Sequence, residues 1–98
     1  MPFKVVVIDD KPLIRQSIVR TIDWSRLDCE VVGQAEDGLE GRTVILEKRP
    51  DILITDIKMP GLSGLQLAEL MQSVMPQSKT ILITGYQEFE YARQARSE

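Results

Sequence analysis

Four oxygen-bearing side chains stand where apolar runs of the sequence end, and their chemistry suits a metal site. They are Asp9, Asp10, Asp56 and Thr84. Carboxylates that lie close together repel one another, and the pKa of at least one rises. A hard divalent cation relieves this repulsion. Because the chain has no histidine and one cysteine, oxygen ligands point to Mg²⁺. The alternative is a set of solvated strand-end acids with weak cation affinity.

The elements that must position these side chains alternate along the chain. Short runs of apolar and β-branched residues predict strands at Lys4–Ile8, Glu30–Gln34, Ile52–Thr55 and Lys79–Thr84. Apolar spacing and Pro or Gly breakers predict helices at Leu13–Ile22, from Asp37 to before Pro50, at Gly64–Met75 and at Glu88–Arg96. This order predicts a doubly wound parallel α/β fold with helices on both faces of the sheet. Parallel strands end at one edge, so the three acids should converge there.

Composition narrows the class of protein. A net charge of −3 and a pI near 5.0 argue against a nucleic-acid-binding surface on this segment. The single cysteine, Cys29, permits no intrachain disulfide and indicates an intracellular, cytoplasmic protein. No apolar run approaches the ~18 residues of a membrane span. A strand that begins within a few residues of Met1 leaves no room for a signal peptide.

Three sequence segments carry a family resemblance. The segments VVIDDKPLIR (6–15), ITDIKMPGLSG (54–64) and ILITGY (81–86) closely resemble the receiver domain of two-component response regulators, the CheY-like fold. The match runs over essentially the whole chain, so residues 1–98 are expected to form one receiver domain. The segments WSRLDCEVVGQAEDG (24–38) and GYQEFEYARQA (85–95) are also similar to receivers joined to AraC-type DNA-binding domains.

The resemblance implies a role for each candidate residue. Asp56 would be the phosphoacceptor that attacks a phosphohistidine of a sensor histidine kinase. Asp10, Asp56 and the backbone carbonyl of Lys58 would bind Mg²⁺ directly, and Asp9 would act through water. The hydroxyl of Thr84 would move to the phosphoryl group and report phosphorylation. Such a domain phosphorylates itself and regulates transcription through an output domain, and it is not a turnover enzyme.

Two departures from the family pattern bear on these expectations. Lys11 follows the acidic pair, and we expect it to point to solvent rather than to reach the phosphoryl site. The family continues into a fifth strand and a fifth helix, whereas this sequence ends at Glu98, so the expected strand order is 2-1-3-4. Neither Lys58 nor Lys79 matches the lysine that the family carries on its fifth strand, and no residue here matches its aromatic switch position. An uncovered edge at Ile81–Ile83 would then favour self-association.

Three other functions remain open from the sequence. A pseudo-receiver would use the same fold as a binding or dimerisation module without phosphorylation. A Mg²⁺-dependent phosphatase with an aspartyl nucleophile would need an Asp-x-Asp arrangement after the first strand, whereas Asp9 and Asp10 are adjacent. A flavin-binding flavodoxin-like protein would need a Ser/Thr/Gly-rich loop after the first strand, and this chain has Asp-Asp-Lys-Pro there.

Overall fold

The computed structural model of the chain describes residues 2–83. Its elements, in chain order, are β1 (Phe3–Ile8), α1 (Pro12–Thr21), the 3₁₀ turn η1 (Ser25–Leu27), β2 (Cys29–Ala35), α2 (Gly38–Lys48), β3 (Ile52–Asp56), α3 (Gly64–Val74) and β4 (Lys79–Ile83). The predicted helix at 88–96 and the predicted strand end at Thr84 lie outside the described residues.

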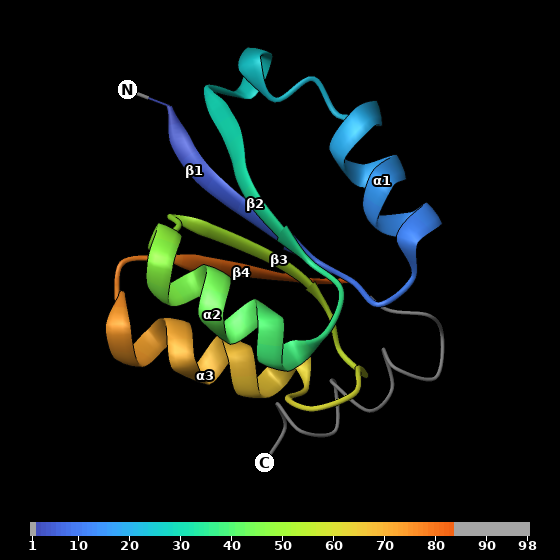
Figure 1. The fold of residues 1–98 in the computed structure, drawn as a ribbon. Coiled ribbons are helices and arrows are strands. Elements are labelled where there is room, and N and C mark those ends of the chain that lie inside the picture. The colour runs from blue at the N-terminus through green and yellow to red at the C-terminus, as the bar shows by residue number, and fades with distance from the viewer. Residues whose placement is uncertain (1, 84–98) are drawn as a thin grey trace.

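The four strands form one parallel sheet in the order β2-β1-β3-β4. The predicted doubly wound fold and its strand order are therefore confirmed. Helix α1 lies on one face of the sheet, and α2 and α3 lie side by side on the other (Figure 1). Because every crossover returns the chain to the same end of the sheet, β1 and β3 both deliver their last residues to one edge.

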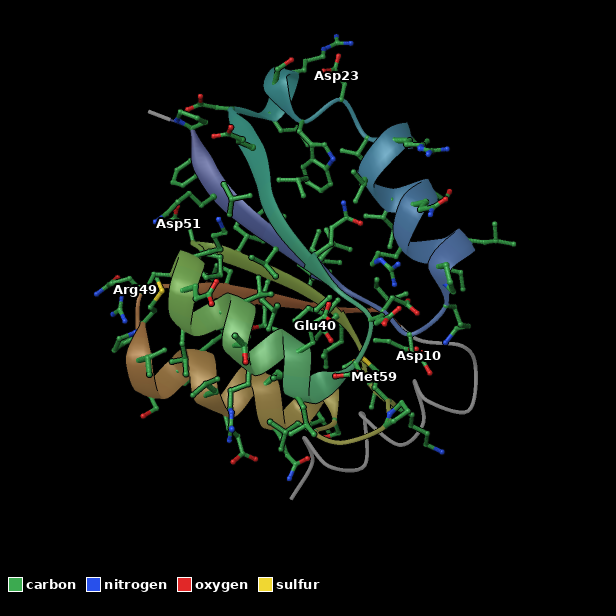
Figure 2. The ribbon with its side chains drawn as sticks, in the orientation of Figure 1. Asp10, Asp23, Glu40, Arg49, Asp51 and Met59 are labelled. Atoms are coloured by element: carbon green, nitrogen blue, oxygen red, sulfur yellow. The ribbon has the colours of Figure 1, made fainter. Side chains whose placement is uncertain are left out.

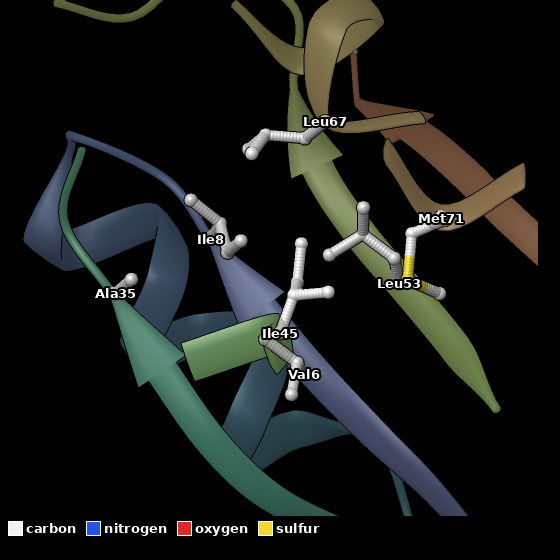
Figure 3. Packing of buried hydrophobic residues seen from close by; sticks show 7 residues of the cluster. All are labelled: Val6, Ile8, Ala35, Ile45, Leu53, Leu67 and Met71. Atoms are coloured by element: carbon white, nitrogen blue, oxygen red, sulfur yellow. The ribbon is translucent and has the colours of Figure 1, made fainter. Parts of the chain in front are cut away.

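The face under α2 and α3 holds most of the core. Its buried side chains come from three strands and both helices (Figure 3), and they are Val6, Ile8, Ala35, Ile45, Leu53, Leu67 and Met71. Each of these residues is at most 2% exposed. Continuous burial along β1 and β3 explains why these strands read as unbroken apolar runs in the sequence.

The face under α1 is covered more thinly. Its buried residues are Val5, Val7 and Ile54, and none of the α1 residues is fully buried. Ile81 of β4 pairs with Ile54 of β3, and it is 53% exposed. Within residues 2–83, β4 is an edge strand of the sheet. Whether this surface supports self-association stays a prediction.

The connection between α1 and β2 was not foreseen. Helix α1 ends at Thr21, and a 3₁₀ turn follows at Ser25–Leu27 where the sequence suggested only a helix end. The Trp24 carbonyl accepts hydrogen bonds from the amides of Leu27 and Cys29, and the Trp24 indole donates to the Val19 carbonyl at 3.1 Å. Periodicity does not reveal such a turn, because local backbone bonds around one aromatic residue hold it together.

In the described part of the chain, no helix combines the length and the apolar character that crossing a membrane requires.

Candidate functional site

Three acidic side chains meet at the carboxyl edge of the sheet. Asp9, Asp10 and Asp56 each offer a carboxylate oxygen, and these oxygens lie within 4.8 Å of one another. Asp10 is labelled in Figure 2 at the end of β1, near the loop after β3 that carries Met59. The structure thus brings together the three acids that the sequence placed at the ends of two different strands. We call this cluster of Asp9, Asp10 and Asp56 the acidic pocket.

Asp9 is the innermost member of the acidic pocket. Its side chain is fully buried, and its amide donates to the Ala35 carbonyl at 3.1 Å, which ties it to the end of β2. Its Oδ1 accepts from the Lys11 amide at 2.8 Å, while its Oδ2 is buried without a hydrogen-bond partner among the described residues. Burial raises the pKa of Asp9, and the negative charges of Asp56 and Asp10 act in the same direction. The nearby Lys11 acts in the opposite direction, but its effect is smaller than that of burial.

Asp56 is held rigidly at the end of β3. It is 5% exposed, and its Oδ1 accepts from the Ile57 amide at 2.8 Å. The Thr55 hydroxyl donates to the Asp56 carbonyl at 2.9 Å, which satisfies a buried polar group inside the apolar strand. A Cβ at Gly64 would lie 2.0 Å from that same carbonyl oxygen, so no larger residue fits there. The position of Asp56 thus depends on two backbone contacts, the Ile57 amide on its carboxylate and Gly64 against its carbonyl.

The loop between β3 and α3 is fixed at several points. Gly61 has φ +81, a conformation that favours glycine. The Pro60 carbonyl accepts from the Gly38 amide at 3.2 Å, which ties the loop to the start of α2. Ser63 and Gln66 form a capping box at the start of α3. Lys58 lies in this loop, two residues after Asp56, and its carbonyl as a metal ligand stays a prediction.

Lys11 does not point to solvent, so that expectation was wrong. Its ammonium nitrogen lies 2.5 Å from Asp56 Oδ2, 3.4 Å from Asp10 Oδ1 and 3.7 Å from Asp9 Oδ1. The hydrogen bond to Asp56, helped by the nearby charge of Asp9, raises the pKa of Lys11. The physical reason is electrostatic: three carboxylates close together attract the ammonium group of the residue that follows the acidic pair. Its place directly after the acidic pair was a signal in the sequence.

The acidic pocket has the donors that a hard divalent cation needs. It offers carboxylate oxygens, one of which, Asp9 Oδ2, is buried and unpartnered. The single charge of the Lys11 ammonium offsets only part of the charge of three ionised carboxylates. Oxygen donors without nitrogen or sulfur ligands in this cluster fit Mg²⁺ better than a softer metal.

Thr84, the predicted switch hydroxyl, lies outside the described residues. Its neighbour Ile83 pairs in register with Asp56, so β4 reaches the same edge of the sheet. The role of Thr84 stays a prediction.

Comparison with known proteins identifies the family of this chain. Residues 5–98 match the family described as response regulator receiver domain. The chain belongs to this family. Receiver domains are the regulated modules of two-component systems, and this agrees with the resemblance seen in the sequence.

Individual relatives agree with the family assignment. The chain is 38% identical over 93 residues to YesN, an uncharacterized transcriptional regulatory protein of Bacillus subtilis strain 168, covering 95% of this chain and 25% of YesN. It is 33% identical over 91 residues to the transcriptional regulatory protein HptR of Staphylococcus aureus strain N315, covering 93% of this chain and 35% of HptR. The chain thus spans roughly a quarter to a third of these curated relatives.

Solved structures show the same fold. The REC domain of AraT, a response regulator from Geobacillus stearothermophilus, is similar with a TM-score of 0.92 and 41% identity, covering 99% of this chain and 75% of that one. A two component transcriptional regulator AraC from Clostridium phytofermentans is similar with a TM-score of 0.86 and 29% identity, covering 95% of this chain and 72% of that one.

Proposed function

We propose that this chain is a phosphoacceptor domain in which Asp56 takes a phosphoryl group from a sensor histidine kinase in a Mg²⁺-dependent reaction. The observation that carries the proposal is the acidic pocket itself. A nearly buried carboxylate stands at the sheet edge beside two further acids, and one oxygen of Asp9 has no hydrogen-bond partner within residues 2–83. This arrangement does not stabilise the fold, because it concentrates negative charge where water is largely excluded. It is explained by a cation and a phosphoryl group that bind there.

The contacts of Asp56 identify its reacting atom. Oδ1 is engaged by the Ile57 amide, and it stays engaged as long as the loop keeps its place. Oδ2 accepts a hydrogen bond from the Lys11 ammonium, which is carried by an exposed and rotatable side chain. In the reaction Oδ2 would form the new bond to phosphorus, the bond between phosphorus and the kinase histidine nitrogen would break, and its electron pair would stay on that nitrogen.

The other pocket residues would hold the cation. Asp10, Asp56 and the Lys58 carbonyl would be direct ligands, and Asp9 would act through a water molecule. Mg²⁺ would offset the charge of a carboxylate that approaches an anionic phosphoryl group. Thr84 would then donate its hydroxyl to a phosphoryl oxygen and report the new state.

The names of the relatives suggest the context. Because YesN and HptR are transcriptional regulatory proteins, we propose that phosphorylation here switches a DNA-binding output domain of the AraC type in a cytoplasmic two-component system. In this proposal the acyl phosphate on Asp56 is the signal itself, so the domain acts as a switch and not as a turnover enzyme.

Phosphorylation by a small donor tests the proposal directly. The chain is incubated with acetyl phosphate and Mg²⁺, and intact-mass spectrometry follows the gain of one phosphoryl group. We expect the gain in the wild type and none in Asp56→Asn, which keeps the shape of the side chain. Asp37→Asn is the matched control, because Asp37 caps α2 and is not one of the three acids of the pocket. Equal phosphorylation of Asp56→Asn, or none in the wild type, would overturn the proposal.

One observation favours a second function. The Lys11 ammonium covers Asp56 Oδ2, as it could in a pseudo-receiver that is never phosphorylated. Beryllofluoride with Mg²⁺, a phosphoryl mimic, separates the two functions by NMR. Shifts of the Ile57 and Asp10 amides support phosphorylation, whereas unchanged spectra leave only the binding module.

A further inference from the structure

The proposed nucleophile is occupied on both of its oxygens. The Ile57 amide holds Oδ1 and the Lys11 ammonium holds Oδ2, at 2.8 and 2.5 Å. Asp56 is also 5% exposed, so no third group reaches it without a rearrangement. The Ile57 contact is part of the backbone of a well-fixed loop. Lys11 is therefore the group that has to move.

Lys11 can move without disturbing the fold. Its amide donates to Asp9 Oδ1, and its carbonyl accepts from the Arg15 amide at 3.0 Å, so its backbone is fixed at the start of α1. Its side chain is 54% exposed and joins the acidic pocket only through its ammonium group. Rotation about side-chain bonds is enough to carry the ammonium into solvent. Because its own side chain is half exposed, the ammonium regains hydration when it leaves, which lowers the cost of breaking its ion pairs.

We propose that Lys11 is a tethered counter-ion that closes the acidic pocket and competes with the divalent cation for Asp56. This inference rests on the proposed function and adds a regulatory element to it. While the pocket holds no metal, the ammonium neutralises part of its charge and shields Oδ2. The cation and the ammonium need the same carboxylate oxygens, so one leaves when the other binds. Lys11 thereby raises the Mg²⁺ concentration at which Asp56 becomes reactive.

Metal binding measured directly tests this competition. Mg²⁺ is titrated into the ¹⁵N-labelled chain at constant ionic strength, and the amide shifts of Asp10 and Ile57 give the Kd. We compare the wild type with Lys11→Met, which keeps the length of the side chain and removes its charge. We expect Lys11→Met to bind Mg²⁺ roughly two- to threefold more tightly, the factor that corresponds to the loss of one half-exposed ion pair.

Two control variants separate local competition from net charge. Lys79→Met makes the same change of charge at the opposite end of the sheet, where Lys79 pairs with Ile52. We expect its Kd to match the wild type. Lys11→Arg keeps a cation at the pocket, and we expect its Kd to stay close to the wild-type value. In the wild type, the Cε signal of Lys11 should also move to the value of a solvated lysine as Mg²⁺ is added.

The outcomes distinguish this inference from the function beneath it. An unchanged or weaker affinity in Lys11→Met, with normal Mg²⁺ binding in the wild type, overturns the competition and leaves the phosphoacceptor function intact. Equal tightening in Lys79→Met reduces the effect to net charge and also overturns it. No Mg²⁺ binding to either protein overturns the metal-dependent function, and the competition with it.

Discussion

Asp56 and Lys11 lie against each other in the acidic pocket, but the chain holds them in different ways. Asp56 is fixed by backbone groups, with the Ile57 amide on its carboxylate and Gly64 packed against its carbonyl. Lys11 has a fixed backbone and a long side chain that remains half exposed. We call Asp56 and its backbone contacts the fixed side of the pocket, and Lys11 the movable side. The fixed side sets the geometry of the reacting atom, whereas the movable side supplies a charge that can leave.

The sharpest test of the fixed side is Gly64→Ala. The new Cβ would lie 2.0 Å from the Asp56 carbonyl oxygen and 3.0 Å from the Ile57 Cα. These are backbone atoms, which cannot shift as easily as the end of a side chain. We expect a loss of about 3 kcal/mol in the free energy of unfolding, together with impaired phosphorylation. Denaturant unfolding followed by the fluorescence of Trp24, the single tryptophan, measures it.

Gly41→Ala is the matched control for this substitution. Its Cβ would meet the end of the Ile8 side chain at 2.6 Å, which can shift, and both glycines lie in helices. We expect a smaller loss, because the end of the Ile8 side chain can shift whereas backbone atoms cannot. Alanine also gains about 1 kcal/mol over glycine in a helix interior, where Gly41 lies, while Gly64 is the first residue of α3. Equal losses in the two variants would show that the Asp56 backbone is not specially constrained.

Asp9→Asn tests how much the buried negative charge of Asp9 lowers the free energy of unfolding. Asp9 is buried with an unpartnered Oδ2, and its raised pKa shows that the folded state disfavours the ionised form. At neutral pH without divalent cations, we expect the variant to be more stable by roughly 1 to 2 kcal/mol. It should also bind Mg²⁺ more weakly. Thermal and denaturant unfolding in the presence of a chelator provide the measurement.

Asp10→Asn is the control for that effect. It removes the same charge from a side chain that is 32% exposed, so its stability should stay within about 0.5 kcal/mol of the wild type. A destabilised Asp9→Asn would mean that the ionised carboxylate is already well compensated in the metal-free protein.

The start of α3 anchors the loop that carries the fixed side. Ser63 accepts from the Gln66 amide, and the Gln66 side chain accepts from the Ser63 amide. We expect Ser63→Ala to lose about 1 kcal/mol. Ser73→Ala, on the same helix but exposed, should be neutral. If Ser63→Ala were also neutral, the capping box would contribute nothing to the loop.

The sequence predicted the fixed side better than the movable one. Unbroken apolar runs ending in Asp9 and Asp56 are enough to place both acids at one edge, because parallel strands share their carboxyl ends. The contact between Lys11 and Asp56 spans 45 positions of the chain. The rotamer of a half-exposed lysine depends on charges that only the fold brings near, so no periodicity reports it. The same holds for the 3₁₀ turn after Trp24, which local hydrogen bonds decide.

The smallest expected effect concerns the contact between the two sides. A double-mutant cycle of Lys11→Met and Asp56→Asn measures their coupling free energy, and we expect about 0.5 kcal/mol, because the lysine is half exposed. A weak coupling is what a displaceable counter-ion requires, since a divalent cation has to break this ion pair to bind. A coupling of about 3 kcal/mol or more would be typical of a buried ion pair. Lys11 would then belong to the fixed side, and Mg²⁺ would have to bind beside it rather than replace it.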